Sequence, residues 1–336
     1  MVICSSYIPN SMDVYKCSFG LIFCLFISLP GTPNEIEPSM GRFDFTNGQT
    51  EVEIPFYTFN NQVILSIKVN DKVSLNFILD SGSPQAVFFD RKLATDIGVG
   101  LGRKIQFSGI GNTNIVTAYR ARGVNLSLPG VEGHMMGMAV LSSDYMDMKR
   151  FDIHGVIGYQ LFARFAVKID YTHRVLTLME PFIYDNSCFH TMDLEVINTK
   201  PYIRSQLYLE NSQHVPLKLM IDTGSAFGLS LITESHPDII MPRKSKKLKL
   251  GTGLGGEIKG VRGQSTIKFG SQLVADTETF FMSPKQFSKE GLHEERMGSI
   301  GGAVLNKYVV IIDYINSKFL LRENPNPGYL SQNAGG

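Results

Sequence analysis

Cysteine is scarce in this chain. Of its four cysteines, three lie near the N-terminus, at Cys4, Cys17 and Cys24, and the fourth is Cys188. A chain that loses its N-terminal segment keeps one cysteine, which excludes an intrachain disulfide and leaves stability to the hydrophobic cores. A thiol peptidase is not indicated, because its cysteine needs a positioned histidine and a third group. The segment around Cys188 offers only His190.

The N-terminal region also lacks a long apolar run. Its apolar stretch, residues 18–29, follows Lys16 and is well short of the roughly 20 residues of a transmembrane helix. This length is typical of a signal-peptide core. We therefore expect residues 1–31 to be a signal peptide or a retained membrane anchor, and the protein to be exported (periplasmic, cell-surface or secreted). The polar, Pro- and Gly-containing residues 32–50 indicate a linker.

The chain has almost no excess charge. Its formal net charge is +1 at pH 7, with 19% charged residues, which gives no electrostatic basis for binding nucleic acid. The basic run from Arg243 to Lys249 is expected on the solvated face of a strand and its leading loop. The seven histidines show no H-E-x-x-H or paired-ligand spacing. Neither a metal nor another cofactor is predicted.

Two motifs of other enzyme classes lack their context. Residues 251–256, GTGLGG, fit a dinucleotide-binding fingerprint, but a β-rich stretch follows them where that fingerprint needs a helix. The segment DSGSP that begins at Asp80 is faintly similar to a trypsin-type serine loop, but the first histidine of the chain is His134. Neither reading is supported.

The most informative feature is a duplicated carboxylate motif. The sequence reads LNFILDSGSPQAVFF around Asp80 and LKLMIDTGSAFGLSL around Asp222. In each copy an apolar strand leads into a carboxylate, whose burial is costly unless it is paired, hydrogen-bonded or shares a proton. Two such carboxylates brought together form an acid–base pair.

The duplication extends beyond these motifs. GVIG ends at Gly158 and GSIG at Gly301, and the later segments KIDY and IIDY carry Asp170 and Asp313. Together with two glycine-rich hairpin tips, these pairs all lie about 143 residues apart, which predicts two copies of one folding unit. We expect Asp170 and Asp313 to cap hairpin turns.

Each copy is expected to be rich in short β-strands. Alternating apolar residues flank the turns at residues 70–71 and 211–212, and a short helix is predicted at residues 90–98 and after each GVIG or GSIG segment. Many short strands with frequent turns predict a small β-barrel or sandwich for each half. The predicted boundaries are a first lobe at 51–182, a linker at 183–190, a second lobe at 191–324 and a flexible tail at 325–336.

The paired motifs resemble those of a known family. Asp80-Ser81-Gly82-Ser83 with the later Gly158, and Asp222-Thr223-Gly224-Ser225 with the later Gly301, are similar to the D-[ST]-G-[ST] loops and trailing glycines of aspartic peptidases. The resemblance is closest to bacterial tandem retropepsin-like proteins and covers about residues 52–323. It implies an all-β fold of two homologous β-barrel lobes related by a pseudo-two-fold axis, with few short helices. It also implies a monomer that acts on a peptide or protein substrate.

The resemblance gives each motif residue a role. Asp80 and Asp222 together are the expected catalytic dyad that activates water, with no assignment of which one is the acid. The loop residues expected to support the dyad are Ser81, Gly82, Ser83, Thr223, Gly224 and Ser225. The first residue after each aspartate is expected to hydrogen-bond across to the opposite loop, the glycines to permit close approach, and the final serines to donate to the outer carboxylate oxygens. Gly158 and Gly301 are expected to let the backbone pack behind the loops.

The glycine-rich hairpins are expected to act as flaps over an extended substrate. Their tips are Gly109, Ile110, Gly111 and Asn112 in the first half and Gly253, Leu254, Gly255 and Gly256 in the second. Two flaps resemble the retroviral homodimer more than pepsin. The predicted function is aspartic endopeptidase. The alternatives are a catalytically inactive peptide-binding module of the same fold, and aspartates that merely cap turns after strands.

Overall fold

The computed structural model describes residues 25–26, 41–111, 115–142, 148–209, 213–242, 247–287 and 295–324. Most of the predicted leader, the predicted tail at 325–336, the hairpin turn at 211–212 and the flap residue Asn112 lie outside these described residues. None of the helices within them has the length and apolar character needed to cross a bilayer.

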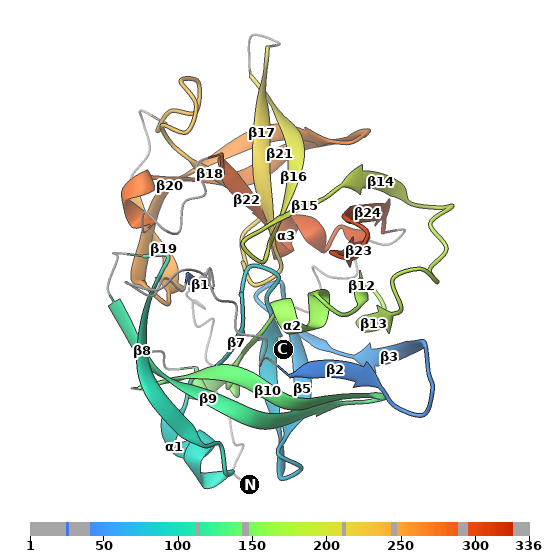
Figure 1. The fold of residues 1–336 in the computed structure, drawn as a ribbon. Coiled ribbons are helices and arrows are strands. Elements are labelled where there is room, and N and C mark those ends of the chain that lie inside the picture. The colour runs from blue at the N-terminus through green and yellow to red at the C-terminus, as the bar shows by residue number, and fades with distance from the viewer. Residues whose placement is uncertain are drawn as a thin grey trace, which may run out of the picture.

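The chain is all-β, as the sequence predicts, and Figure 1 shows its strands gathered into sheets with only short helices between them. The described α-helices are α1 (Arg91–Asp96), α2 (Tyr159–Phe162) and α3 (Gly302–Leu305). All three lie in segments where the sequence predicts a short helix. At α1 the side chain of Asp90 accepts a hydrogen bond from the Leu93 amide, which is a favourable N-cap.

A ten-stranded sheet contains only strands from the first half. Its order is β1 (Leu25–Phe26), β8 (Leu101–Gly109), β9 (Ile115–Leu128), β10 (Val131–Leu141), β7 (Ala86–Phe88), β11 (Gly155–Ile157), β6 (Val73–Leu79), β5 (Gln62–Val69) and β4 (Tyr57–Phe59), with β2 (Arg42–Phe45) paired to β10. The β5–β6 turn has positive φ at Asn70 and Asp71, as a tight hairpin between twisted strands requires.

An eight-stranded sheet contains only strands from the second half. Its order is β15 (Glu195–Ile197), β16 (Lys200–Tyr208), β17 (His214–Asp222), β22 (Gly298–Gly301), β18 (Leu229–Ile232), β21 (Gln272–Met282), β20 (Gly256–Phe269) and β19 (Lys247–Gly253). The pairing sequence β17–β22–β18–β21–β20–β19 matches β6–β11–β7–β10–β9–β8 of the first sheet strand for strand. In both, the strand that leads into the aspartate pairs in parallel with the strand from GVIG or GSIG.

A six-stranded sheet contains strands from both halves (Figure 1). Its order is β14 (His190–Asp193), β24 (Lys318–Glu323), β23 (Tyr308–Asp313), β12 (Ala166–Asp170), β13 (Val175–Met179) and β3 (Glu51–Pro55). The central pair is β12 with β23, antiparallel, with Val167 opposite Ile312. The closing hairpins of the two halves are therefore continuous with each other through backbone hydrogen bonds.

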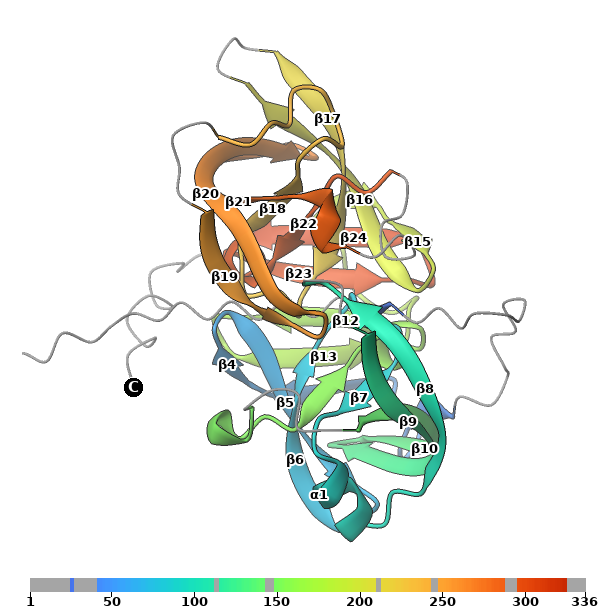
Figure 2. The same cartoon turned by 90° about the vertical axis from the view of Figure 1, so that its left-hand side faces the viewer.

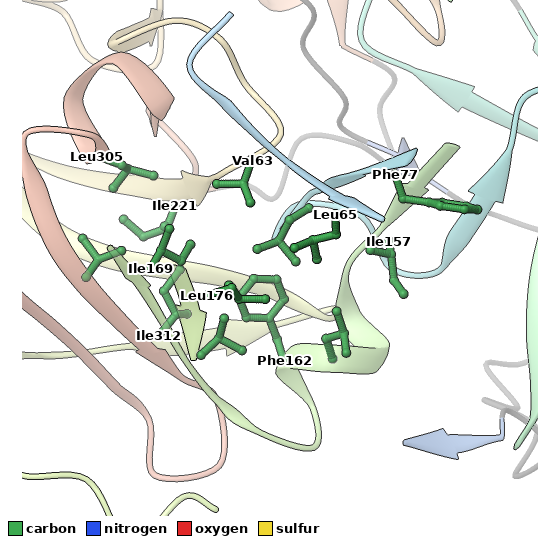
Figure 3. Close-up of a cluster of buried hydrophobic side chains, with 14 of the residues drawn as sticks. Val63, Leu65, Phe77, Ile157, Phe162, Ile169, Leu176, Ile221, Leu305 and Ile312 are labelled. Carbon is green, nitrogen blue, oxygen red and sulfur yellow. The ribbon is translucent and has the colours of Figure 1, made fainter. Parts of the chain in front are cut away.

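The largest hydrophobic core also draws on both halves. Figure 3 shows part of it, in which Val63, Leu65 and Phe162 of the first half share one buried cluster with Ile221 and Leu305 of the second. At about 25 cal/mol per Å² of buried apolar surface, a core that spans the halves stabilises their arrangement as well as each half.

The prediction that residues 32–50 form a linker is wrong for part of that range. Residues 42–45 form β2, which pairs antiparallel with β10. Phe43 on this strand is fully buried, and burying an aromatic side chain is a strong driving force for ordering the segment.

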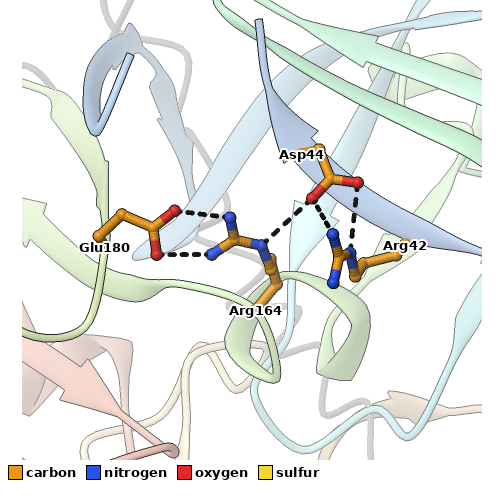
Figure 4. A network of polar contacts seen from close by, with 4 residues as sticks. All are labelled: Arg42, Asp44, Arg164 and Glu180. Atoms are coloured by element: carbon orange, nitrogen blue, oxygen red, sulfur yellow. Dashed lines mark hydrogen bonds and ion pairs between the residues drawn. The ribbon is translucent and has the colours of Figure 1, made fainter. Parts of the chain in front are cut away.

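A polar network also anchors β2 (Figure 4). The Arg164 guanidinium binds both carboxylate oxygens of Glu180, at 2.6 and 2.9 Å. It also lies 3.6 Å from the Asp44 carboxylate, which is paired with Arg42. A bidentate arginine–carboxylate contact is the stronger kind of ion pair, so this network connects β2 to the segments that follow α2 and β13.

The aspartates of the closing hairpins cap turns, which confirms the prediction for them. Asp170 Oδ1 accepts hydrogen bonds from the Thr172 and His173 amides, each at 3.0 Å. Asp313 Oδ1 accepts one from the Asn316 amide at 2.9 Å.

Candidate active site

The two aspartates of the duplicated motif end equivalent strands and are buried. Asp80 directly follows β6 and Asp222 is the last residue of β17, and both side chains are 0% exposed. The Asp80 amide donates to the Ile157 carbonyl of β11 at 2.8 Å. Burying two ionised carboxylates away from solvent costs free energy, so the charges and hydrogen bonds around them determine their protonation.

The loops that carry the aspartates are joined by reciprocal hydrogen bonds. Ser81 Oγ donates to the Ile221 carbonyl at 2.7 Å and accepts from the Thr223 amide at 3.1 Å. Thr223 Oγ1 donates to the Leu79 carbonyl at 2.8 Å and accepts from the Ser81 amide at 2.9 Å. Each hydroxyl therefore satisfies a donor and an acceptor on the opposite loop, and all four contacts are buried. This cross-bonding fixes the two loops to each other.

Gly224 lies directly against the Asp80 carboxyl group. A Cβ atom at Gly224 would be 2.4 Å from Asp80 Cγ, a distance that no side chain tolerates, so this position requires glycine for close approach. Gln62 reaches the same residue from β5, since its Nε2 donates to the Gly224 carbonyl. The first aspartate thus packs against the loop of the second.

Electrostatics favour the protonated form of Asp80. Burial raises the pKa of Asp80 well above its usual range, and the negative charge of Asp222 raises it further. The amides of Gly82 and Ser83 and the positive charge of Lys200 act in the opposite direction. The Gly82 amide donates to Asp80 Oδ1 at 2.8 Å. A buried carboxyl that also feels a second carboxylate is the electrostatic setting in which two groups share one proton.

Tyr314 was not anticipated from the sequence. Its hydroxyl donates to the Ser81 carbonyl at 2.9 Å, which supports the first loop from the closing hairpin of the second half. Burial and the negative charge of Asp80 raise the pKa of Tyr314, so the phenol remains a neutral donor. The signal for it was the tyrosine that follows the aspartate in both KIDY and IIDY, whose first-half member is Tyr171.

The prediction for Ser83 is wrong. Its hydroxyl donates to the Gln85 carbonyl at 2.7 Å, and a hydroxyl has one proton to donate, so it is not also a donor to the carboxylate. The backbone amide of Ser83 acts on Asp80 in its place. In the second loop, Ser225 Oγ accepts from the Phe227 amide at 3.3 Å.

Gly158 and Gly301 lie behind the two loops. A Cβ atom at Gly158 would be 2.1 Å from the Asp80 carbonyl oxygen, and one at Gly301 would be 2.4 Å from that of Phe227. The residues that follow these glycines bond to the loops, with the Tyr159 amide donating to the Ser83 carbonyl at 2.9 Å. The strands from GVIG and GSIG therefore form the back of the site.

The tips of the two predicted flaps meet each other. Figure 2 shows the hairpins β8–β9 and β19–β20 converging between the two larger sheets. Gly111 forms a β-bridge with Gly255, whose amide donates to the Ile110 carbonyl at 3.1 Å. A Cβ atom at Gly255 would be 2.2 Å from the Gly109 carbonyl oxygen, so the contact depends on glycine. The second tip is a two-residue turn closed by the pair Gly253–Gly256.

Each tip buries its apolar residue in the other half of the molecule. Ile110 of the first half belongs to a cluster with Met220 and Phe227, which flank Asp222. Leu254 of the second half belongs to a cluster with Ile78 and other buried residues of the first half. Both tip side chains are fully buried. The hairpins are thus held together by exchanged apolar contacts as well as by backbone bonds.

A cavity of about 260 Å³ opens beside the second aspartate loop. Phe227 and Phe280 line it, with ring centroids 4.4 Å apart. Lys249 and the Arg262–Glu278 ion pair also line it. The cavity therefore combines an aromatic surface with charged groups. No group of three or more His, Cys, Asp or Glu side chains in the described ranges is arranged to hold a metal ion.

A protein-family model matches part of the chain. Residues 65–161 match the family model described as aspartyl protease, which supports the assignment to the aspartic peptidase family that the motifs indicated. The matched range contains Asp80, the first hairpin and Gly158, whereas Asp222 lies outside it. No curated protein matches the chain.

Proposed function

We propose that this chain is an aspartic endopeptidase that uses Asp80 and Asp222 as one dyad between two similar β-lobes. The aspartyl protease match supports a protease-type function. The observation that carries the finer proposal is the buried, reciprocal set of hydrogen bonds between Ser81 and Thr223. These bonds connect the two aspartate loops directly. Aspartates that merely capped turns after their strands would not need such a connection.

In the proposed reaction the dyad carries one proton between its two carboxyl groups. The ionised carboxylate takes a proton from water as its oxygen attacks the peptide carbonyl carbon, while the protonated carboxyl donates to the carbonyl oxygen. The tetrahedral intermediate then collapses. Its C–N bond breaks as the protonated carboxyl donates to the leaving nitrogen and the ionised carboxylate takes a proton from one hydroxyl of the intermediate, and the products are a carboxylic acid and an amine. Charge never accumulates beyond one negative charge on the pair, which suits a buried site.

The hairpin tips are proposed to cover the bound substrate. In their present contact Ile110 and Leu254 are buried across the two halves, so substrate entry requires these side chains to leave their clusters. Closure of the same contact after binding would exclude water other than the nucleophile. We further propose that the aromatic cavity takes an apolar side chain of the substrate.

The wider setting is proposed as well. The chain is expected to act outside the cytoplasm as a monomer on peptide or protein substrates, with residues 1–31 as its export signal or anchor. These expectations follow from the sequence and need their own tests, such as fractionation of cells that produce the full chain.

Cleavage of a diverse peptide library between acid and neutral pH tests the proposal. Asp80→Asn and Asp222→Asn are each expected to reduce the cleavage rate by at least about 10³-fold, because general acid–base catalysis is worth 10²–10⁴. Asp96→Asn, on the exposed end of α1, is the matched control and should retain the wild-type rate.

The contrary result is a folded wild-type protein that binds library peptides and cleaves none of them. That outcome would replace the peptidase with a peptide-binding module of the same fold.

A further inference from the structure

One glutamine, Gln286, contacts both of the hairpins whose tips meet. It is the last residue of the short 3₁₀ helix η2 (Pro284–Gln286), which begins two residues after β21 ends. Its side-chain oxygen accepts a hydrogen bond from the Lys259 amide at 2.5 Å, and its side-chain nitrogen donates to the Lys259 carbonyl. Its backbone carbonyl accepts from the Gly111 amide at 3.0 Å. Gln286 therefore holds the second hairpin through its side chain and the first through its backbone.

The Gln286 side chain extends the ladder between β20 and β21. The registered pairs of this ladder end at Val261–Phe281, two residues short of Lys259. Backbone donors and acceptors of a strand need partners where the neighbouring strand has ended. A side-chain amide carries an acceptor oxygen and a donor nitrogen, like a peptide group, so Gln286 pairs with both backbone groups of Lys259.

The first half fills the equivalent place with a backbone bond. Its pair Tyr119–Val140 corresponds to Val261–Phe281, which makes Thr117 the counterpart of Lys259. The Thr117 carbonyl accepts from the Ser142 amide at 3.0 Å. The fold can thus extend this ladder without a side chain, so the Gln286 contact is specific to the second hairpin.

The residue after Gln286 adds an apolar connection to the first hairpin. Phe287 is 5% exposed and belongs to the same buried cluster as Ile110, the apolar residue of the first tip. Gly111, the partner of the Gln286 carbonyl, directly follows Ile110. Residues 286–287 therefore fix the first tip by a backbone bond and by a shared cluster, while the Gln286 amide fixes the second hairpin.

Resting on the proposed peptidase function for its role in the reaction, we propose that Gln286 is a positioning residue that couples the two hairpins, so that they open and close together. Neither hairpin leaves its place without breaking a contact to residues 286–287. Concerted closure brings both tips over a bound peptide at once and excludes bulk water from the dyad. Gln286 acts through the hairpins and takes no part in the proton transfers.

Hydrogen exchange of single backbone amides, followed by NMR on the full chain, tests the coupling without any catalysis. Gln286→Met keeps the length of the side chain but removes both of its bonds to Lys259. We expect the Lys259 and Gly111 amides to exchange faster by a similar factor, about 10-fold or more, because two hydrogen bonds are lost. The Gly111 amide is the informative one, since the backbone carbonyl that it binds is still present in this variant.

A matched variant and a distant amide are the controls. Gln106→Met removes an exposed amide group from β8 of the first hairpin and should leave the exchange rates unchanged. The Ala94 amide of α1, which donates to the Asp90 carbonyl at 3.0 Å, should exchange at the wild-type rate in every variant.

Restoring the two bonds with a different group provides a rescue. Below the usual glutamate pKa of about 4.3, the protonated carboxyl of the Gln286→Glu variant offers one donor and one acceptor. Its exchange rates for Lys259 and Gly111 should then approach those of wild type at the same pH. They should exceed the wild-type rates near neutral pH, where the ionised carboxylate has no proton for the Lys259 carbonyl.

The split between kcat and KM supplies the second readout. Without coupling the closed complex is less populated, so Gln286→Met should lower kcat about 10-fold, with smaller changes in KM and in the urea midpoint of unfolding. A purely structural role would lower that midpoint and leave kcat unchanged, which overturns the proposal. So does a Gly111 amide that exchanges at the wild-type rate in Gln286→Met, because the contact is then local to the second hairpin. A wild type that shows the coupled exchange but cleaves no peptide contradicts the peptidase function and leaves the coupling intact.

Discussion

The first half of the chain has Gln62 at the start of β5, where it donates to the Gly224 carbonyl of the opposite loop, and the second half has the buried Lys200 at the start of the equivalent strand, β16. Around them the strand pairings of the two halves agree, from the parallel partner of the aspartate strand to the hairpin that reaches the centre. Tyr171 and Tyr314 differ in a similar way. Tyr314 donates to the Ser81 carbonyl, whereas the Tyr171 hydroxyl is buried without a hydrogen-bond partner among the described residues. Matching backbones can thus carry different chemistry, because hydrogen-bonded ladders fix the strands while single side chains set the charge.

Apart from the aspartates themselves, the largest expected effect comes from Gly224, where the second loop lies against the Asp80 carboxyl group. Gly224→Ala places a Cβ atom 2.4 Å from Asp80 Cγ, so the loops must separate. We expect a loss of cleavage of about 100-fold or more, together with roughly 1–3 kcal/mol of destabilisation from overpacking. Peptide cleavage and urea denaturation measure the two effects. Gly100→Ala, with open space around its new Cβ, is the control, and equal behaviour of the two variants would contradict the close approach.

The cross-bonds between the loops should give the next largest effect. Thr223→Val keeps the side-chain shape but removes the hydroxyl that bonds to the Leu79 carbonyl and the Ser81 amide. Leaving these buried groups unpaired is expected to cost about 2–3 kcal/mol in the free energy of unfolding. Thr223→Ser retains the hydroxyl and should lower the free energy of unfolding much less. Comparable losses for valine and serine at this position would show that packing, and not the cross-bond, matters there.

The pH dependence of stability should distinguish Asp80 from a turn-capping aspartate. Because the pKa of Asp80 is raised in the folded state, its contribution to stability is greatest below its unfolded pKa of about 3.9 and is lost as pH rises through the folded value. Relative to wild type, Asp80→Asn should therefore gain stability between about pH 4 and pH 7. Denaturant titrations across this range measure the difference.

Asp170 serves as a control, because the pH dependence of its contribution to stability is expected to have the opposite sign. Burial alone would raise the pKa of Asp170, but hydrogen bonds from His173 and Thr172 lower it overall. Its contribution is present above the unfolded pKa and is lost as pH falls, so Asp170→Asn should lose stability relative to wild type as pH rises from about 3. Parallel curves for the two variants would contradict the raised pKa of Asp80.

The smallest predicted effect compares the two tyrosines. Tyr314→Phe removes the bond to the Ser81 carbonyl and is expected to cost about 1 kcal/mol. Tyr171→Phe removes a buried hydroxyl without a described partner and should be neutral or slightly stabilising. Thermal unfolding of both variants measures the contrast, which would disappear if the two hydroxyls were equivalent.

Much of the fold was predictable because its signals are local. Alternating apolar residues indicated the hairpins, and the constant spacing of motifs indicated two similar halves. The pairing of β12 with β23 was not predictable, because partners so far apart in sequence leave no local pattern. The same holds for β2, where the buried Phe43 and the ion pairs of Asp44 anchor a segment whose composition indicates a linker.

Within the site, motif residues were easier to predict than the residues that tune them. The aspartates and their neighbouring hydroxyl residues stand out by repetition. Lys200 follows a turn and would ordinarily be placed on the surface, whereas the structure leaves it only 4% exposed. The hydroxyl of Ser83 was assigned to the carboxylate, but the nearby Gln85 carbonyl is its acceptor. Such choices depend on local geometry that residue type does not specify.

The central claim, that Asp80 and Asp222 work as one unit, is tested most directly by comparing the two single asparagine variants with the double variant in peptide cleavage. Residues that act as a unit are strongly non-additive. The account predicts that Asp80→Asn and Asp222→Asn each lose at least about 10³-fold in rate and that the double variant loses no more. A single variant that keeps a rate near wild type, or a double variant whose loss is the product of the single losses, would contradict a shared dyad.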